Sequence, residues 1–299
     1  MSNALHYRPV EGRRVPPFLR PWALVQQELA TLFRFRWGIA LFLFCLLPGL
    51  ARLVMLLIAF GVLNFGPVQM QRRLAGRTPP ELLQFDPRHA AFYIEPVVSV
   101  LPGMVFFLVL TTVVVARSVA GDRAVNALEL YWTRSITPWR YLLGKWLGGA
   151  LLTSAITIGV PLVLWLTALF LAEDFALLAD SVLPLLRALG ALVVMTLVWT
   201  GIGTLLSTIA GGPNLAMVLW IGLTIGSSAL GNILSRVLRE PWLRECLSFW
   251  DAGAVLVRWS ADLPQRQVSV AGAATTLVVL LAAALLLAAR RLRTEEALQ

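Results

Sequence analysis

One segment of this chain combines charged, aromatic and hydroxyl side chains between two strongly apolar stretches. It covers residues 120–149 and reads AGDRAVNALELYWTRSITPWRYLLGKWLGG. Charged side chains in such a mixture suit recognition of a protein partner, because charges at an interface set register and specificity. The candidate contact residues in this segment are Asp122, Arg123, Asn126, Glu129 and Arg134.

The residue types elsewhere do not point to catalysis or to a metal. His6 and His89 are isolated, and no spacing of Cys, His and Asp resembles a metal-ligand pattern. Ser and Thr residues in the apolar runs have no candidate base beside them. The chain lacks the phosphate-binding pattern G-x-x-x-x-G-K-[ST], since its one Gly–Lys pair, Gly144–Lys145, is followed by Trp146. We therefore expect no catalytic residue, no metal site and no directly bound cofactor.

Composition indicates an all-α polytopic membrane protein. Of 299 residues, 58% are hydrophobic and 14% are charged, and the mean hydropathy is +0.77. A soluble domain is nearer to about 45–50% apolar and about 25% charged. The net charge of +9 does not indicate nucleic-acid binding, because the basic residues stand mainly beside apolar runs. Lys145 is the only lysine, and Cys45 and Cys246 cannot form a disulfide framework.

Six apolar runs are long enough to cross a bilayer, which takes about 20 residues for roughly 30 Å of hydrocarbon. They lie at about 37–62, 98–116, 143–171, 182–209, 215–234 and 268–289. Together they predict one transmembrane domain over 37–289. Pro161 is expected to bend the third span, and Gly222-x-x-x-Gly226 in the fifth would permit close helix approach.

The segments before and after this domain are expected in the cytoplasm, with the protein in the inner (plasma) membrane. Residues 1–20 form a polar, basic tail that does not resemble a secretory signal, and 290–299 form a second tail. Fourteen basic residues fall on the side of the two termini and nine on the other, which favours cytoplasmic termini. Residues 21–36 predict an interfacial amphipathic helix. Its predicted apolar face is Trp22, Val25, Leu29, Leu32 and Phe33, with Gln26, Gln27, Glu28 and Arg34 lying largely elsewhere.

The charged segment itself is predicted to stay outside the hydrocarbon. Residues 117–142 contain six charged side chains, and at roughly 2.5–3.5 kcal/mol each they would cost on the order of 15–20 kcal/mol near the bilayer centre. Val125, Leu128 and Trp132 recur with helical spacing, which predicts a short amphipathic helix at about 122–134. Thr137–Pro138 is a second helix start, with Thr137 as N-cap, and it leads directly into the third span.

The remaining features lie on the side away from the termini. Two long connections, 67–97 and 235–267, are rich in proline or tryptophan, and the second predicts short helices at the outer interface. Arg52 and Arg187 fall within spans toward the same side. They either extend to lipid headgroups or contact an anionic substrate.

The segment VAGDRAVNALELYWTRSITPWRYLLGKWLGG resembles the region between spans two and three of ABC exporter permeases of the ABC-2 class. An acidic–Arg pair, an LEL-like core, a Ser/Thr–Pro-type turn and LLGK occur there in the same order. The six-span layout, the preceding interfacial helix and the long connection between spans five and six also resemble this family. Asp122, Asn126 and Ser135 depart from its usual Glu, Gly and Pro.

The resemblance implies a permease subunit of an ATP-driven exporter that forms the translocation path. Residues 122–134 would be its coupling helix, the helix that sits in a groove of a separate ATP-binding subunit carrying ATP and Mg. A second permease subunit would complete a homodimer or heterodimer, surrounded by membrane lipid, with no nucleic acid bound. The alternatives are a non-transporting membrane assembly factor and an ion-coupled carrier. The carrier is disfavoured because no acidic residue lies deep in a span.

Overall fold

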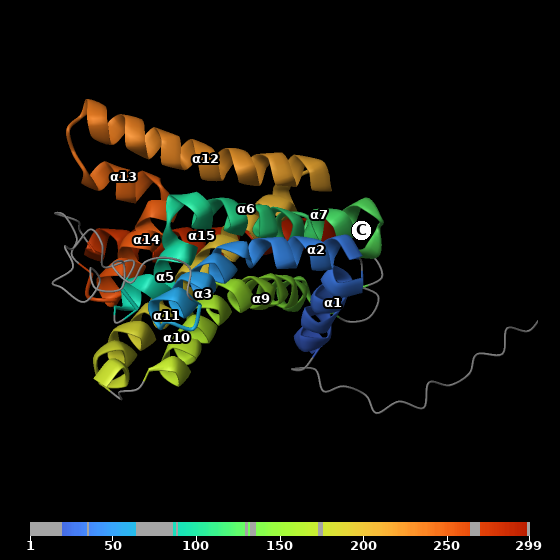
Figure 1. Cartoon of the computed structure of the whole chain (residues 1–299). Coiled ribbons are helices and arrows are strands. Elements are labelled where there is room, and N and C mark those ends of the chain that lie inside the picture. The colour runs from blue at the N-terminus through green and yellow to red at the C-terminus, as the bar shows by residue number, and fades with distance from the viewer. Residues whose placement is uncertain are drawn as a thin grey trace, which may run out of the picture.

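The protein is a bundle of helices in a computed structural model (Figure 1). The structure describes residues 20–34, 36–63, 86–87, 89–128, 131, 136–172, 176–263 and 270–297. Within these ranges every regular element is helical and none is a strand. The predicted all-α class is therefore confirmed.

Five helices are long and apolar enough to cross a membrane, which confirms a membrane protein. They are Leu101–Ala124, Pro138–Leu171, Ser181–Ile209, Pro213–Val237 and Val270–Thr294. A sixth candidate is the bent pair α2 (Arg36–Cys45) and α3 (Leu47–Ala59), whose axes differ by 45°. Pro48 lies in the first turn of α3, where its missing N–H and fixed φ permit a new helix start but break the preceding ladder. The count is thus five spans, or six if this pair is one span.

The helical run at the second predicted span extends beyond that span. It was expected to end at residue 116, but the helical run continues through η3 (Val100–Met104), α6 (Val105–Thr111), η4 (Thr112–Ala116) and α7 (Ser118–Ala124). η4 is a π-helical turn, in which one extra residue per turn changes which side chains face the neighbours, and η3 contains a kink at Leu101, which has φ −128° and ψ 122°. Because the helical run extends to Ala124, Asp122 and Arg123 belong to its last turn.

The next helical run bends close to the predicted proline. α9 (Pro138–Thr157) begins at Pro138 after Thr137, as expected, although the Thr137 side chain accepts no capping hydrogen bond. The chain leaves helical pairing at Ile158 and continues as α10 (Gly159–Leu171). Pro161 has no N–H to bond the carbonyl of Thr157, which places the break one turn before the proline. The ladder resumes where Leu162 donates to Ile158 at 3.1 Å.

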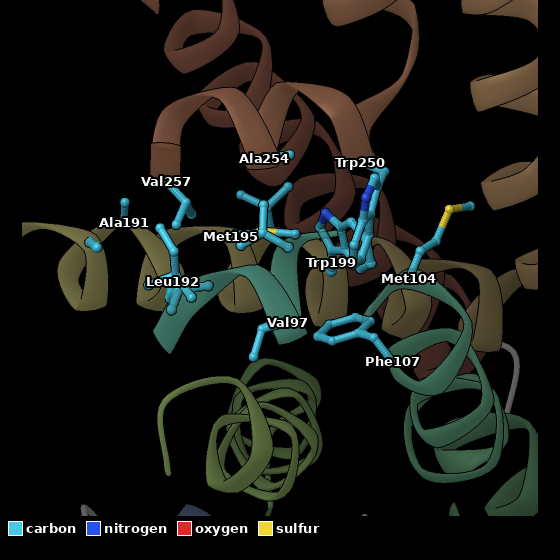
Figure 2. Close-up of a cluster of buried hydrophobic side chains, with 14 of the residues drawn as sticks. Val97, Met104, Phe107, Ala191, Leu192, Met195, Trp199, Trp250, Ala254 and Val257 are labelled. Atoms are coloured by element: carbon cyan, nitrogen blue, oxygen red, sulfur yellow. The ribbon is translucent and has the colours of Figure 1, made fainter. Parts of the chain in front are cut away.

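The centre of the bundle is α11 (Ala176–Ile209), which packs against α15 (Val270–Ala297), α14 (Phe249–Ser260) and α9. Trp199 of α11 lies edge-on to Phe107, with ring centroids 4.4 Å apart, and 3.9 Å from the ring of Trp250 (Figure 2). These rings are buried. Large aromatic side chains therefore fill the space where α6, α11 and α14 meet.

Two short helices of the long connections lie inside the bundle. α5 (Ala90–Val98) and α14 are mostly buried, while α13 (Trp242–Leu247) leaves Trp242 exposed. The expectation of short helices is met, and α14 is buried within the bundle rather than lying on its surface. Trp250 and Val257, seven residues apart, share one apolar face of α14. Trp250 packs on Trp199 of α11, and Val257 faces Leu192 of α11 (Figure 2). α12 (Pro213–Val237) stands at the edge of the bundle (Figure 1).

α1 (Arg20–Arg34) covers most of the predicted interfacial helix. It lies at the same end of the bundle as α7 and the C-terminal end of the chain (Figure 1). Leu24, Val25 and Leu32 are buried, whereas Trp22 and Phe33 of the predicted apolar face are exposed. The face of α1 that packs on the protein is therefore rotated from the predicted one, toward Leu24 and Glu28.

Candidate functional site: the charged end of the bundle

The only lysine of the chain lies buried where α1, α7 and α9 meet. Lys145 of α9 is 3% exposed, and its Nζ donates to Glu28 Oε1 of α1. The same Nζ lies 2.7 Å from Asp122 Oδ2 of α7. Glu28 is 11% and Asp122 17% exposed. One ammonium thus joins two carboxylates from two other helices, and we call Glu28, Asp122 and Lys145 the lysine triad.

Tyrosines complete the surroundings of the lysine triad. Tyr141, one helical turn before Lys145, donates its hydroxyl to Asp122 Oδ2 at 2.8 Å, and Lys145 Nζ lies 5.8 Å from its ring centroid. The Tyr131 ring lies 5.3 Å from that of Tyr141. The Tyr131 hydroxyl both accepts from Gln27 Nε2, at 3.0 Å, and donates to Gln27 Oε1, at 3.1 Å. Two successive residues of α1 therefore bond to other parts of the chain: Gln27 to Tyr131 in the segment before α9, and Glu28 to Lys145 of α9.

Two glycines let α1 approach α9 closely. A Cβ added at Gly144 would lie 2.7 Å from the Leu24 Cβ, and one at Gly148 would lie 2.9 Å from the Glu28 Cβ. The pattern Gly144-x-x-x-Gly148 places both on one helix face, where small residues permit close backbone packing. The hydrogen bond from Lys145 to Glu28 depends on this close packing of α1 against α9.

Burial changes the acid–base behaviour of Glu28. Desolvation raises the pKa of its carboxyl above the ordinary value; the Lys145 ammonium acts in the opposite direction, and the Asp122 carboxylate adds to the increase. With two carboxylates for one ammonium, the lysine triad carries one excess negative charge when all three groups are ionised. Protonation of Glu28 therefore becomes easier.

Arg123, the neighbour of Asp122, points to a different helix. Its Nη2 donates to the Thr208 carbonyl at 2.7 Å and its Nη1 to the Ala210 carbonyl at 2.8 Å, at the C-terminal end of α11. A cation there satisfies carbonyls that have no helical donor. Ser207 Oγ also accepts from the backbone N–H groups of Val119 and Ala120, at 3.1 and 3.0 Å. The adjacent charges of Asp122 and Arg123 thus fasten α7 to α9 on one side and to α11 on the other.

The predicted coupling helix at 122–134 is not confirmed as one helix. α7 ends at Ala124, and the chain turns at Val125 and Asn126, where Asn126 has a φ of 54°. Val125 is 74% exposed, whereas Leu128 is buried, so these two residues do not share one apolar face. Glu129 and Arg134 lie outside the described residues. Of the five predicted contact residues, Asp122 and Arg123 bind within the bundle and Asn126 lies at the exposed turn.

The two arginines predicted near the other end have separate partners. The Arg52 guanidinium lies 5.5 Å from the Phe92 ring centroid of α5, close enough for the Glu95 carboxylate to act on its charge. Arg187 pairs with Asp262 at 3.4 Å, and both side chains are more than half exposed. These contacts of Arg52 and Arg187 therefore involve different residues.

Sequence reasoning missed Glu28, Tyr141 and Lys145 as a group. One signal was available in α1, because Glu28 lies four residues from both Leu24 and Leu32 and so shares their helical face. A second signal was the single lysine among 25 basic residues, flanked by Gly144 and Gly148. An acid on an apolar face and an amine between glycines are each expected to find a buried partner.

These features define a polytopic helical membrane protein with a charged, cross-connected end. No protein-family model and no curated protein sequence matches the chain. Across the described ranges, no three His, Cys, Asp or Glu side chains group in a way that could hold a metal ion.

Proposed function

We propose that this chain is the membrane-spanning permease subunit of an ATP-driven exporter and works with a separate ATP-binding subunit. The support from sequence is the resemblance of residues 119–149 and of the span layout to permeases of the ABC-2 class. The support from structure is a set of candidate spans with one charged end. A second permease subunit would complete the transport path.

The observation that carries the proposal is the double fastening of α7. Asp122 reaches Lys145 of α9, and Arg123 reaches the carbonyls that end α11. A partner that pushes on the exposed turn at Val125 and Asn126 would therefore displace two spans together. Transmission of this kind needs contiguous packed and hydrogen-bonded elements, which this end of the bundle has.

The proposal is tested by affinity purification of the full chain in mild detergent, with identification of the proteins bound. We expect an ATP-binding subunit to co-purify and to hydrolyse ATP. Recovery of the intact chain without such a subunit, from cells that express its genomic neighbours, would contradict the proposal and favour a non-transporting assembly factor.

A charge reversal at Glu129 tests whether residues 122–134 contact the ATP-binding subunit. Glu129→Lys is expected to weaken co-purification of the ATP-binding subunit or to alter its hydrolysis rate, since a misplaced like charge at an interface can cost several kcal/mol. The matched control is Glu295→Lys in the C-terminal tail. Equal behaviour of both variants and the wild type would show that residues 122–134 do not contact the partner.

We also propose Arg52 and Arg187 as contacts for an anionic substrate or lipid headgroup. Arg187 is half exposed and pairs with Asp262, and Arg52 lies beside the Phe92 ring of α5. Replacing both with Gln should reduce the amount of anionic phospholipid that co-purifies with the chain. Unchanged lipid content and unchanged association with the ATP-binding subunit would remove this role.

A further inference from the structure

We propose that Lys145 is a positioning residue that makes α1 part of the moving unit, so that α1, α7 and α9 respond together to the partner subunit. The proposal rests on the proposed function for its ATP-dependent part. Its structural part, that the lysine triad sets the position of α1, stands on contacts of this chain alone.

The first step is that α1 has few other polar contacts to hold it. Among the described residues, the side chains of α1 that bond another helix or the segment before α9 are Glu28, to Lys145, and Gln27, to Tyr131. Its apolar contacts, through Leu24 and Leu32, bring α1 close to α9 but are non-directional. An ion pair with a buried lysine instead fixes one register.

The second step is that the same ammonium also holds α7. Lys145 Nζ lies 2.7 Å from Asp122 Oδ2, and the Tyr141 hydroxyl donates to that same oxygen at 2.8 Å. Since α9 supplies both donors, α9 is the centre and α1 and α7 are its two attachments. Removing the lysine charge would leave Glu28 and Asp122 facing each other without a counter-charge.

The third step concerns the path along which a displacement travels through these helices. α7 ends in the exposed turn at Val125 and Asn126, which a partner can reach. A displacement there passes through Asp122 and Lys145 to Glu28, and so to α1 and the bent pair α2 and α3 that follows it. Lys145 thus transmits the partner's displacement to α1, although Lys145 itself does not contact the partner.

The experiment measures the position of α1 by spin labels, in a chain with Cys45→Ser and Cys246→Ser. One label is placed on α1 at Ala30→Cys and one on α12 at Ile225→Cys; both positions are exposed, and α12 lies on the other side of the bundle from α1 (Figure 1). A second pair replaces Ala30→Cys with Leu147→Cys on α9. Distances are measured for the chain alone and for its complex with the co-purified ATP-binding subunit, with and without ATP and vanadate.

For the chain alone, we expect the α1–α12 distance distribution to broaden in Lys145→Met and in Glu28→Gln, and to stay narrow in Lys145→Arg, which keeps the charge. The control is Glu95→Gln, which breaks an ion pair at the other end and should leave α1 in place. Unchanged distributions in both Lys145→Met and Glu28→Gln would overturn the proposal. Two variants are used because either one could fail to fold on its own.

For the complex, we expect ATP and vanadate to shift the α1–α12 and α9–α12 distances together in the wild type. In Lys145→Met the α1 shift should be lost while the ATP-binding subunit still co-purifies and hydrolyses ATP. Equal shifts in Lys145→Met and the wild type would overturn the role in transmission. If no ATP-binding subunit co-purifies even with the wild type, the proposed function fails, and the measurements on the chain alone still decide the role of Lys145 in positioning α1.

Discussion

Arg258 donates to both carboxylate oxygens of Glu95, from Nε at 2.9 Å and from Nη2 at 3.2 Å. The pair joins α14 to α5, two short helices from connections that are far apart in the sequence. Glu95 is 12% exposed and Arg258 38%. An ion pair with two parallel hydrogen bonds fixes orientation as well as distance. The end opposite the lysine triad is therefore also held by a largely buried acid–base contact.

Breaking this contact is expected to destabilise the protein measurably. Glu95→Gln should lower the free energy of unfolding by about 1–3 kcal/mol, because Arg258 loses a charged partner in a half-buried position. Arg187→Gln is the matched control, since its pair with Asp262 is more than half exposed on both sides and should contribute about 0–1 kcal/mol. Denaturant titration in detergent micelles measures both, and equal losses would contradict this reasoning.

Removing the Arg123 guanidinium should loosen the end of α11. Arg123→Met deletes the donors to the Thr208 and Ala210 carbonyls, at a cost of about 2 kcal/mol. Amide hydrogen exchange over residues 207–214 should then accelerate by roughly 30-fold, which is that cost expressed as an equilibrium constant. Arg290→Met, an exposed arginine at the same end, should leave exchange unchanged. Protection equal to wild type in Arg123→Met would show that these bonds do not hold the helix end.

Closing the space between α1 and α9 should displace α1. In Gly148→Ala the new methyl group would lie 2.9 Å from the Glu28 Cβ and 3.4 Å from the Val25 Cα, so backbone must move. We expect a loss of about 1–3 kcal/mol, as for overpacking of a core. In Gly159→Ala the Cβ meets nothing within 4 Å, and stability should be unchanged or slightly higher. Thermal unfolding of the two variants compares them directly; equal melting temperatures would mean that α1 is not closely packed there.

The stability of the protein is expected to decrease as pH rises between about 4.5 and 7, through Glu245 of α13. Burial and the neighbouring Asp251 raise the pKa of Glu245 to about 7, against the opposing effect of Arg244. The folded state therefore holds a proton that the unfolded state has released, and this contribution is complete below about pH 4.5 and lost above about pH 7.

Glu245→Gln should reduce the pH dependence in that window, by a slope of at most about 1.4 kcal/mol per pH unit. Glu240→Gln, an exposed glutamate of the same connection, should keep the wild-type slope. Unfolding measured at several pH values tests both. A wild-type slope in Glu245→Gln would assign the dependence to other groups.

The orientation in the membrane is predicted from the basic residues and from α1 and the C-terminal end lying together. In a Cys45→Ser, Cys246→Ser background, Arg77→Cys and Pro264→Cys should react with an impermeant thiol reagent in intact cells. Arg293→Cys should react only after permeabilisation. The reverse pattern would place the charged end outside and would rule out contact with a cytoplasmic ATP-binding subunit.

Much of the fold follows from local signals in the sequence. Pro138 begins a helix where the residue order predicted one, and the break at Ile158 follows from Pro161. Long apolar runs form helices because every backbone polar group in a bilayer must be hydrogen-bonded within the segment or by a close partner. Such signals need no knowledge of the neighbouring helices.

The side-chain contacts of the candidate site, in contrast, depend on residues of the neighbouring helices. Asp122 and Arg123 were expected to be available to a cytoplasmic partner, because their segment carries too much charge to lie in hydrocarbon. In the structure Asp122 pairs with Lys145, and Arg123 donates to the carbonyls of Thr208 and Ala210. A cost per residue cannot include a partner that is twenty or eighty positions away. For the same reason, Glu28 was placed on the polar side of α1.

The burial of α14 constrains the order in which the protein can be assembled. Its 12 residues measure about 18 Å, too short for a bilayer core of about 30 Å. It carries Asp251 and Arg258, so it does not enter lipid as an independent helix. Because it packs against both α11 and α15, its buried position requires both helices to be in place. α14 therefore completes its packing only after a helix that follows it in the chain.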